Sequence, residues 1–479
     1  MIIIPANTLS AGGYEVDNSI RFNDGDSPKL TRTFGSSGNQ TTWTISMWVK
    51  RGVLGTAQPL WSRFQSSAYG TIGTFNSNDT LTFKQWHASS DTGNLTTDRV
   101  FRDCSAWYNI IFVWNSGDAT AGNRMRLFIN GVEETSFSTD TNPSEDLAST
   151  WNTAHPMIFG NSESTYFDGY LAEIVFLDGT AVSDGTSFGE FDEDSNIWKP
   201  IDVSGLTGGT NGVYLDMEDS STLGNDAFGG TDWTATNLAA VDQATDTPTN
   251  NFPTLNSLAI GSFPVLSEGN LNVRANSDAE YGNIIGTFST SSSGKWYYEI
   301  KVIGKTGTSP WVGLIVDDAP KAGIATNGGA NSAGSSSFSA PSFVIQSDGQ
   351  VTQAGSAGTT YTSFAIGDII SFSIDMDNGA CYIAKNGTYM NSGNPASAGS
   401  KTGAIITWTA GSVSGFLPAV SVYGASTSSG SFSAVSMNFG SPTFAISSGN
   451  TDGDGYGNFE YAVPSDYFSL NTKNLAEYG

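Results

Sequence analysis

The most constraining feature of this sequence is a strand-length alternation of apolar and polar residues that leads directly into a tight-turn dipeptide. From residue 370 to residue 376 every even-numbered side chain is apolar and every odd-numbered one is serine or aspartate, and Asn378-Gly379 follows. A two-residue period predicts a strand with one buried face, and Asn-Gly favours the tight turn of a β-hairpin. Residues 124–129 show a similar pattern before Asn130-Gly131. The sequence therefore predicts antiparallel hairpins.

Further strand-length apolar runs occur along the chain, with turn residues between them. The clearest are residues 41–50, 107–114, 170–177, 295–302 and 416–422. Composition agrees, because 56 glycines suit turns and an aromatic content of 12% suits pleated surfaces. No stretch rich in Ala, Leu, Glu and Lys has a helical period. We expect an all-β protein of β-sandwich type with very little helix.

A change in composition near residue 240 divides the chain. Residues 242–264 carry three prolines among many Asn and Thr, without a sustained period, which is typical of a linker. The total of 479 residues is ample for two domains. We expect an N-terminal arm (1–14), a first sandwich (15–240), a linker (241–261), a second sandwich (262–445) and an extended C-terminal arm (446–479).

The chain is strongly acidic, with 46 Asp and Glu against 20 Lys and Arg and a formal net charge of −26. Such a surface repels phosphate backbones and anionic lipids, so neither a nucleic acid partner nor membrane insertion is expected. The opening Met1–Pro5 has too short an apolar run for a signal peptide. Cys104 and Cys381 lie in different predicted domains, so we expect no disulfide and folding in a reducing cytoplasm.

Several segments identify the type of each predicted sandwich. The first part contains TISMWVKR (44–51), AWYNIIFVWN (106–115), RLFINGV (126–132) and YFDGYLAEIVFLDG (166–179). With these, residues 15 to about 180 resemble the laminin G-like, concanavalin A-like jelly rolls. The second part contains GKWYYEIKV (294–302), WVGL (311–314), GDIISFSIDMDNGACYIAKNG (367–387), FLPAVSV (416–422) and MNFG (437–440). With these, residues 271 to about 440 resemble the SPRY domain. Both resemblances imply β-sandwiches that serve many binding roles.

Three further segments carry a second resemblance: IPANTLSAGGYEVDNSIRFND (4–24), DTPTNNFPTLN (246–256) and YAVPSDYFSLNTKNL (461–475). The two sandwiches, combined with these three segments, are similar to a class of bacteriophage structural proteins. It implies a virion-surface protein of tail-fibre or receptor-binding type, made in the host cytoplasm, that recognises the host surface, for example through glycans. Its partners would be other virion proteins and a host glycan or receptor, and we expect a homo-oligomer, for which a trimer is suitable. The alternative is a capsid fibre or decoration protein with a structural, protein-binding role. A glycan hydrolase is a third class.

Two motifs suggest catalysis, but neither has the context that catalysis requires. Gly185-Thr-Ser187-Phe-Gly189 fits the nucleophile pattern G-x-S-x-G, yet no histidine follows it in the chain. Glu190, Asp192 and Asp194 alternate as in the E-x-D-x-E strand of concanavalin-fold glucanases, but Asp194 is one methylene short and a turn follows it. A surface turn and an acidic loop explain these residues. We therefore expect no enzyme activity and no catalytic residues.

Two groups of acidic residues are candidate calcium sites. Asp452 and Asp454 place oxygen ligands at alternate positions of a glycine-rich loop, although the spacing is not that of an EF-hand. Asp24 and Asp168 lie where laminin G-like sandwiches can carry calcium at the rim. For both groups the alternative is a solvated Asp-Gly turn. Beyond a possible calcium ion, no cofactor is expected.

Carbohydrate recognition would need aromatic side chains on loops, with amides and carboxylates beside them. Six residues of the first predicted sandwich fall in or near loops: Trp61, Tyr69, Trp86, His87, Trp151 and Tyr166. Packing in a half-buried position is the alternative for each, since large aromatic side chains are usually buried. As a group they form the predicted ligand-binding face.

Overall fold

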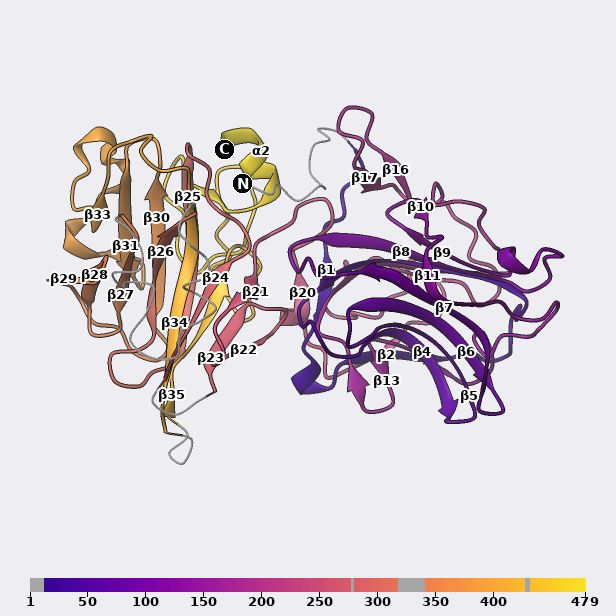
Figure 1. Ribbon diagram of the computed structural model, residues 1–479. Coiled ribbons are helices and arrows are strands. Elements are labelled where there is room, and N and C mark those ends of the chain that lie inside the picture. The colour runs from indigo at the N-terminus through magenta and orange to yellow at the C-terminus, as the bar shows by residue number, and fades with distance from the viewer. Residues whose placement is uncertain (1–12, 277–279, 318–340, 427–430) are drawn as a thin grey trace. The chain divides into compact units, whose positions relative to one another are not determined.

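The computed structural model describes residues 13–276, 280–317, 341–426 and 431–479. The chain divides into two compact units, with the boundary between Asn251 and Phe252. Strands dominate both units (Figure 1). This confirms the predicted all-β architecture. Residues 1–12, most of the predicted N-terminal arm, lie outside the described residues.

The first unit contains two eight-stranded antiparallel sheets. One sheet has the order β10-β9-β8-β3-β15-β1-β20, with β18 also paired to β15. Its strands are β1 (Ser19–Phe22), β3 (Thr42–Arg51), β8 (Trp107–Asn115), β9 (Met125–Ile129), β10 (Val132–Glu133), β15 (Gly169–Asp178), β18 (Val213–Leu215) and β20 (Gln243–Ala244).

The other sheet has the order β11-β7-β6-β5-β4-β12-β2-β19. Its strands are β2 (Lys29–Thr33), β4 (Gln58–Ser66), β5 (Tyr69–Phe75), β6 (Thr80–His87), β7 (Ser90–Val100), β11 (Phe137–Thr141), β12 (Pro156–Phe159) and β19 (Thr234–Thr236). Two small hairpins, β13 (Asn161–Ser162) with β14 (Thr165–Tyr166) and β16 (Gly189–Phe191) with β17 (Trp198–Pro200), and the short turns η1 (Asp24–Asp26), η2 (Ala121–Asn123) and η3 (Ala240–Asp242) complete the unit.

The second unit is also built from two sheets. One has the order β21-β24-β34-β26-β27-β28-β29, with β35 on β34, and the other β22-β23-β36-β25-β30-β31-β32, with β33 on β31 and β37 on β25. The strands of the first are β21 (Leu255–Ile260), β24 (Glu280–Gly286), β26 (Trp311–Val316), β27 (Phe343–Gln346), β28 (Gln350–Gln353), β29 (Ser356–Thr360), β34 (Phe416–Ser426) and β35 (Ser431–Phe432). Those of the second are β22 (Pro264–Ser267), β23 (Asn272–Ala275), β25 (Lys295–Gly304), β30 (Ile369–Asp375), β31 (Ala380–Lys385), β32 (Thr388–Tyr389), β33 (Ile406–Thr407), β36 (Ala434–Asn438) and β37 (Phe468–Ser469). The helical pieces are η4 (Met390–Ser392), η5 (Pro395–Ser400) and α2 (Thr472–Tyr478).

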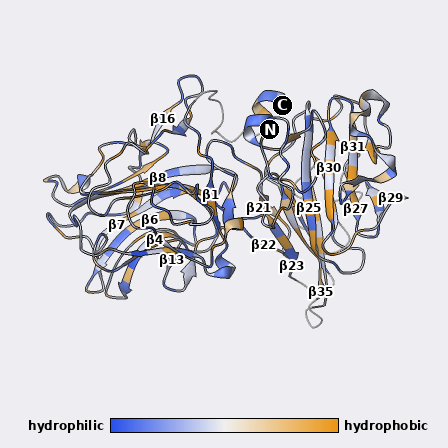
Figure 2. Ribbon diagram, turned by 180° about the vertical axis from the view of Figure 1, so that it is seen from behind, coloured by the Kyte–Doolittle hydropathy of each residue, from blue (hydrophilic) through white to orange (hydrophobic). Residues whose placement is uncertain are grey.

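The predicted hairpins form where the sequence places them. β30 pairs with β31 across Asn378-Gly379, and β9 pairs with β10 across Asn130-Gly131. Asn130 and Gly131 have φ angles of 49° and 75°, as a type I′ turn requires. The strands carry hydrophobic stretches, clearly visible in β8 and β30 (Figure 2). Each unit buries its own main apolar cluster.

Residues 241–261 were predicted to be a linker, but the structure places them within the two units. β20 pairs with β1, and the buried Asp246 accepts hydrogen bonds from Lys50 Nζ at 2.6 Å and Trp107 Nε1 at 3.1 Å. On the other side of the boundary, β21 pairs with β24. A polar residue such as Asp246, which is typical of a loop, is here the buried partner of Lys50, because a buried lysine requires a hydrogen-bond acceptor.

Residues 446–479 were predicted to be an extended arm, but they pack onto the second sandwich. β37 pairs with β25 in parallel, and Leu470 and Leu475 belong to the main apolar cluster. The carboxylate of Glu299, on β25, accepts hydrogen bonds from the backbone N–H groups of Glu460 and Tyr461 at 3.0 and 2.8 Å. Buried apolar side chains and buried hydrogen bonds together hold this segment on the sandwich.

In the described part of the chain, no helix is long and apolar enough to cross a membrane. Cys104 and Cys381 are both buried, one in each unit.

Candidate functional site

Two of the six aromatic residues predicted to bind a ligand lie in the hydrophobic core, and for these the prediction is wrong. Trp61, on β4, and Trp151 are both fully buried, and their ring centroids are 4.9 Å apart. Gly73 lies opposite Trp61 across the sheet, and a Cβ atom there would come within 2.3 Å of the indole Nε1. The glycine thus makes room for the Trp61 ring in the interior.

The other four residues keep part of their surface exposed. Tyr69 and His87 face each other at the end of the β5–β6 hairpin, with ring centroids 4.7 Å apart in an edge-to-face arrangement. Trp86 precedes His87 on β6, and Tyr166 lies on β14. All four belong to strands, and Tyr69 and His87 lie at strand ends, in agreement with their predicted place in or near loops. No observation tests their proposed role in binding, which stays a prediction.

Trp86 borders a surface hollow of about 340 Å³, here called the β4–β7 hollow. Strands β4 to β7, which lie side by side (Figure 1), supply one part of its lining, and the β13–β14 hairpin supplies another. The lining residues are Phe64, Ser67, Ile72, Lys84, Trp86, Ser89, Asp91, Ser162 and Glu163. The sequence could have predicted the hollow only through the side chains that β4, β5 and β6 direct to the outer face of the sheet. These side chains can be identified only once the strand register is known.

Local contacts fix the orientation of the Trp86 ring. The ring lies over Gly70 of the neighbouring strand, where a Cβ atom would be 2.2 Å from the indole carbons. The indole Nε1–H donates to the carbonyl oxygen of Ser66 at 3.2 Å. The Phe64 ring packs beside it at a centroid distance of 6.0 Å. The half-buried indole is therefore held in place before any ligand arrives.

Polar groups surround this aromatic surface. Lys84 Nζ lies 2.8 Å from Asp91 Oδ1 in an ion pair, and also 6.0 Å from the centroid of the Trp86 ring. Three serine residues and Glu163 complete the lining. An aromatic face with hydroxyl, ammonium and carboxylate groups beside it can stack against the apolar face of a sugar ring while hydrogen-bonding its hydroxyls.

The candidate catalytic residues are arranged as structural groups. Glu190 and Asp192 both contact Lys199, with oxygen-to-Nζ distances of 3.3 Å, in the region of the β16–β17 hairpin. Hydrogen bonds from the backbone and hydroxyl of Ser195 lower the pKa of Asp192 to about 2, so this carboxylate does not act as a general acid near neutral pH. Ser187 lies in a turn that leads into a strand and not into a helix. The absence of enzyme activity stays a prediction, and this geometry supports it.

Asp452 makes hydrogen bonds that leave little room for a cation. Its Oδ1 accepts from the backbone N–H groups of Asp454 and Tyr456 at 3.1 and 2.9 Å. Its Oδ2 accepts from the backbone and hydroxyl of Ser469 and from the amide of Asn474, at 2.6 to 2.8 Å. With two oxygens engaged by five donors, the carboxylate serves to fold the C-terminal segment.

The second candidate calcium site is also poorly arranged. Asp24 is exposed in η1, whereas Asp168 is fully buried before β15. Across the described ranges, no three His, Cys, Asp or Glu side chains are grouped so as to hold a metal ion. Neither predicted position has such a group of side chains, and calcium binding there stays a prediction.

Comparisons with known proteins identify both units. Residues 23–185 match the model of the concanavalin A-like lectin/glucanases superfamily, and residues 295–439 match the model of the SPRY domain. The chain thus carries a concanavalin A-like domain followed by a SPRY domain, which confirms these two resemblances. Both domain types point to a binding role.

Solved structures provide three further likenesses. The SPRY domain of human HERC1 is 15% identical, with 36% of this chain and 91% of that chain covered and a TM-score of 0.26. A human SPRY domain is 14% identical, with coverages of 39% and 98% and a TM-score of 0.27. A heptameric SAP-like pentraxin from Limulus polyphemus is 15% identical, with coverages of 36% and 80% and a TM-score of 0.26. No curated protein sequence matches the chain.

Proposed function

We propose that this chain is a non-enzymatic recognition protein that binds a surface glycan in the β4–β7 hollow. The observation that carries the proposal is the Trp86 indole, held over Gly70 beside the Lys84–Asp91 ion pair. Because the ring and the ion pair are already in position, a sugar would not have to order them on binding, which favours affinity. Tyr69 and His87, at the end of the same hairpin, extend the surface available to a longer glycan.

The biological setting that we propose is the surface of a bacteriophage virion, as a tail fibre or receptor-binding protein. Support for this comes from the similarity of residues 4–24, 246–256 and 461–475 to phage structural proteins. Copies of the chain would form a homo-oligomer, held together either by other virion proteins or by contacts between the surfaces of their sandwiches. Several copies matter because a single shallow sugar site binds weakly, about millimolar, and multivalency raises the effective affinity.

A second candidate function is structural, as a capsid fibre or decoration protein that contacts other virion proteins. The acidic and polar loops suit such a role as well as they suit recognition. It predicts no affinity for glycans, and this difference makes the two functions separable by experiment.

The experiment is a glycan microarray probed with the labelled, multimerised full-length chain. Wild-type protein should bind a subset of glycans, and Trp86→Ala should weaken this binding by about 5- to 150-fold, since stacking on an aromatic ring contributes about 1–3 kcal/mol in nucleic acid sites. The matched control is Phe191→Ala, which removes an exposed aromatic residue of the same unit outside the hollow. If Trp86→Ala binds glycans as well as wild type does, the glycan site lies outside the β4–β7 hollow. If the wild-type chain binds no glycan, the structural role is favoured.

Hydrolysis is tested on the same glycans. Release of reducing sugar by the wild-type chain, lost in Glu190→Gln, would contradict the non-enzymatic proposal.

A further inference from the structure

Arg63 lies on the opposite face of the sheet from the β4–β7 hollow. On β4, Ser62 pairs with Ile72, Arg63 with Thr71 and Phe64 with Gly70. Because successive side chains of a strand point to opposite faces, Arg63 shares its face with the core residue Trp61, whereas Phe64 faces the hollow. Only 3% of Arg63 is exposed.

The guanidinium of Arg63 has no acceptor in the described part of the chain. Nε and Nη1 are buried without a hydrogen-bond partner. The third nitrogen, Nη2, also makes no hydrogen bond, but it is not fully buried, so it is the atom that a ligand could reach. The polar neighbours on this face bond to one another instead. Gln85 Oε1 accepts from Thr71 Oγ1 at 3.1 Å and from the backbone N–H of Thr150 at 2.8 Å.

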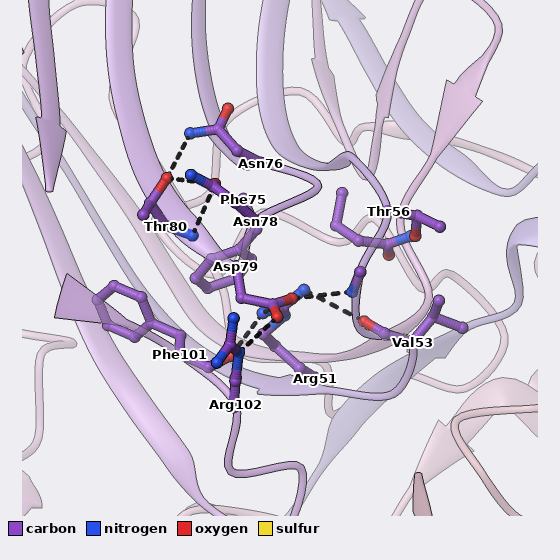
Figure 3. Close-up of polar contacts among 12 residues, drawn as sticks. Arg51, Val53, Thr56, Phe75, Asn76, Asn78, Asp79, Thr80, Phe101 and Arg102 are labelled. Atoms are coloured by element: carbon purple, nitrogen blue, oxygen red, sulfur yellow. Dashed lines mark hydrogen bonds and ion pairs between the residues drawn. The ribbon is translucent and has the colours of Figure 1, made fainter. Parts of the chain in front are cut away.

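Other buried arginines of the same unit are well partnered. Arg51 forms an ion pair with Asp79 at 3.1 Å and donates to the carbonyl oxygens of Val53 and Phe101 (Figure 3). Arg124 donates to three carbonyl oxygens and pairs with Glu145 at 3.2 Å. Arg63 departs from this pattern although acidic residues outnumber basic ones by 46 to 20 in the chain.

We propose that Arg63 is an anion-binding residue whose ligand is a small carboxylate, either free or carried on a sugar. An unpaired buried charge is costly, and a guanidinium recognises a carboxylate through two parallel hydrogen bonds. Nη2 belongs to both bidentate edges of the guanidinium, one shared with Nε and one shared with Nη1, so an anion that reaches Nη2 also meets a second unpaired donor. Burial lowers the pKa of Arg63, and a bound carboxylate would oppose this shift. The site lies outside the β4–β7 hollow and adds to the proposed glycan binding.

The test uses the full-length chain in sodium acetate, sodium glucuronate and sodium chloride at one ionic strength, with glucose in chloride as the neutral control. Three proteins are compared: wild type, Arg63→Met, and Arg274→Met, which removes the same charge from an exposed position. Wild type and Arg274→Met should melt at a higher temperature in acetate or glucuronate than in chloride. Arg63→Met should melt higher than wild type in chloride, because an unpaired buried charge is gone, and should show no further rise with either carboxylate.

A second measurement does not depend on the variant's folding. The Nε–H resonance of Arg63 in the wild-type NMR spectrum should shift on titration with acetate or glucuronate and not with glucose. A response to glucuronate alone would assign the ligand to an acidic sugar, and a response to both would assign it to small carboxylates in general. The proposal is overturned if neither carboxylate moves the resonance or the melting temperature relative to chloride. It is also overturned if Arg63→Met melts below wild type in chloride, since the guanidinium would then already have stabilising contacts.

Discussion

Glu173 makes the stability of the first unit depend on pH in a way that one substitution should remove. The residue lies at a β-bulge of β15 with a φ of 50°, and its carboxyl is buried. The hydroxyls of Tyr14 and Tyr214 donate to it at 3.2 and 2.9 Å. Burial outweighs these hydrogen bonds and raises the pKa of Glu173 from 4.5 to about 8.

The direction of this pH dependence follows from the linkage between proton binding and folding. Between pH 4.5 and about 8 the folded state holds a proton on Glu173 that the unfolded state has released, so this residue makes folding less favourable as pH rises through that window. Below pH 4.5 both states are protonated and the effect vanishes. At 1.36 kcal/mol for each pH unit, the full effect is about 4–5 kcal/mol. The variant Glu173→Gln carries no titrating group, so it should match wild type near pH 4.5 and become more stable by about this amount near pH 8.

The assay is urea unfolding of both proteins from pH 4.5 to pH 8.5, followed by the fluorescence of the 12 tryptophans, all but three of which (Trp296, Trp311 and Trp408) lie in the first unit. Glu133→Gln, which neutralises an exposed glutamate of the same unit, is the control and should show only a small difference that varies little with pH. A stability difference between Glu173→Gln and wild type that stays constant over this range would refute the argument. So would a difference that shrinks as pH rises.

Four further predictions concern charge and stability. Asp79→Asn should lower the free energy of unfolding of the first unit by about 3–5 kcal/mol, because it leaves the buried Arg51 guanidinium without its carboxylate; urea unfolding measures this, and a loss under about 1 kcal/mol would contradict it. Asp452→Asn should destabilise the second unit by about 1–3 kcal/mol, because an amide nitrogen cannot accept from Ser469 and Asn474. Calcium added at constant ionic strength should leave the wild-type melting temperature unchanged, and a rise would restore a calcium site. The melting temperature should increase between low salt and about half-molar NaCl, since screening relieves the repulsion of a net charge of −26; a flat or falling curve would argue against this.

The fold could be predicted from the sequence because its strongest signals are local. The alternation in residues 370–376 and the dipeptide Asn378-Gly379 determine a strand and a turn without reference to the rest of the chain. The linker and the C-terminal arm were not predictable in this way. Lys50 and Asp246 are 196 residues apart in sequence, and nothing near Asp246 indicates that a buried lysine will pair with it.

The candidate site was predicted only in part for a related reason. Trp61 and Trp86 are each followed by a polar residue, Ser62 and His87, yet one is fully buried and the other lines the β4–β7 hollow. The difference depends on which face of the sheet each occupies, and hence on the register between β4, β5 and β6. Gly73 opposite Trp61 and Gly70 opposite Trp86 accommodate a ring in each case, one inside and one outside. The sequence alone identifies the aromatic residues, but the strand pairing determines which of them are buried and which are exposed.

The central claim, that the β4–β7 hollow binds a glycan, is tested most directly by NMR of the full-length chain with selectively labelled tryptophan. The titrant is the oligosaccharide that binds best on the microarray. We predict that the indole Nε1–H resonance of Trp86, identified by its loss in Trp86→Phe, shifts with increasing ligand. The resonances of the buried Trp61 and Trp151 should stay in place. Saturable binding that leaves the Trp86 resonance unmoved while a tryptophan elsewhere responds would contradict the account.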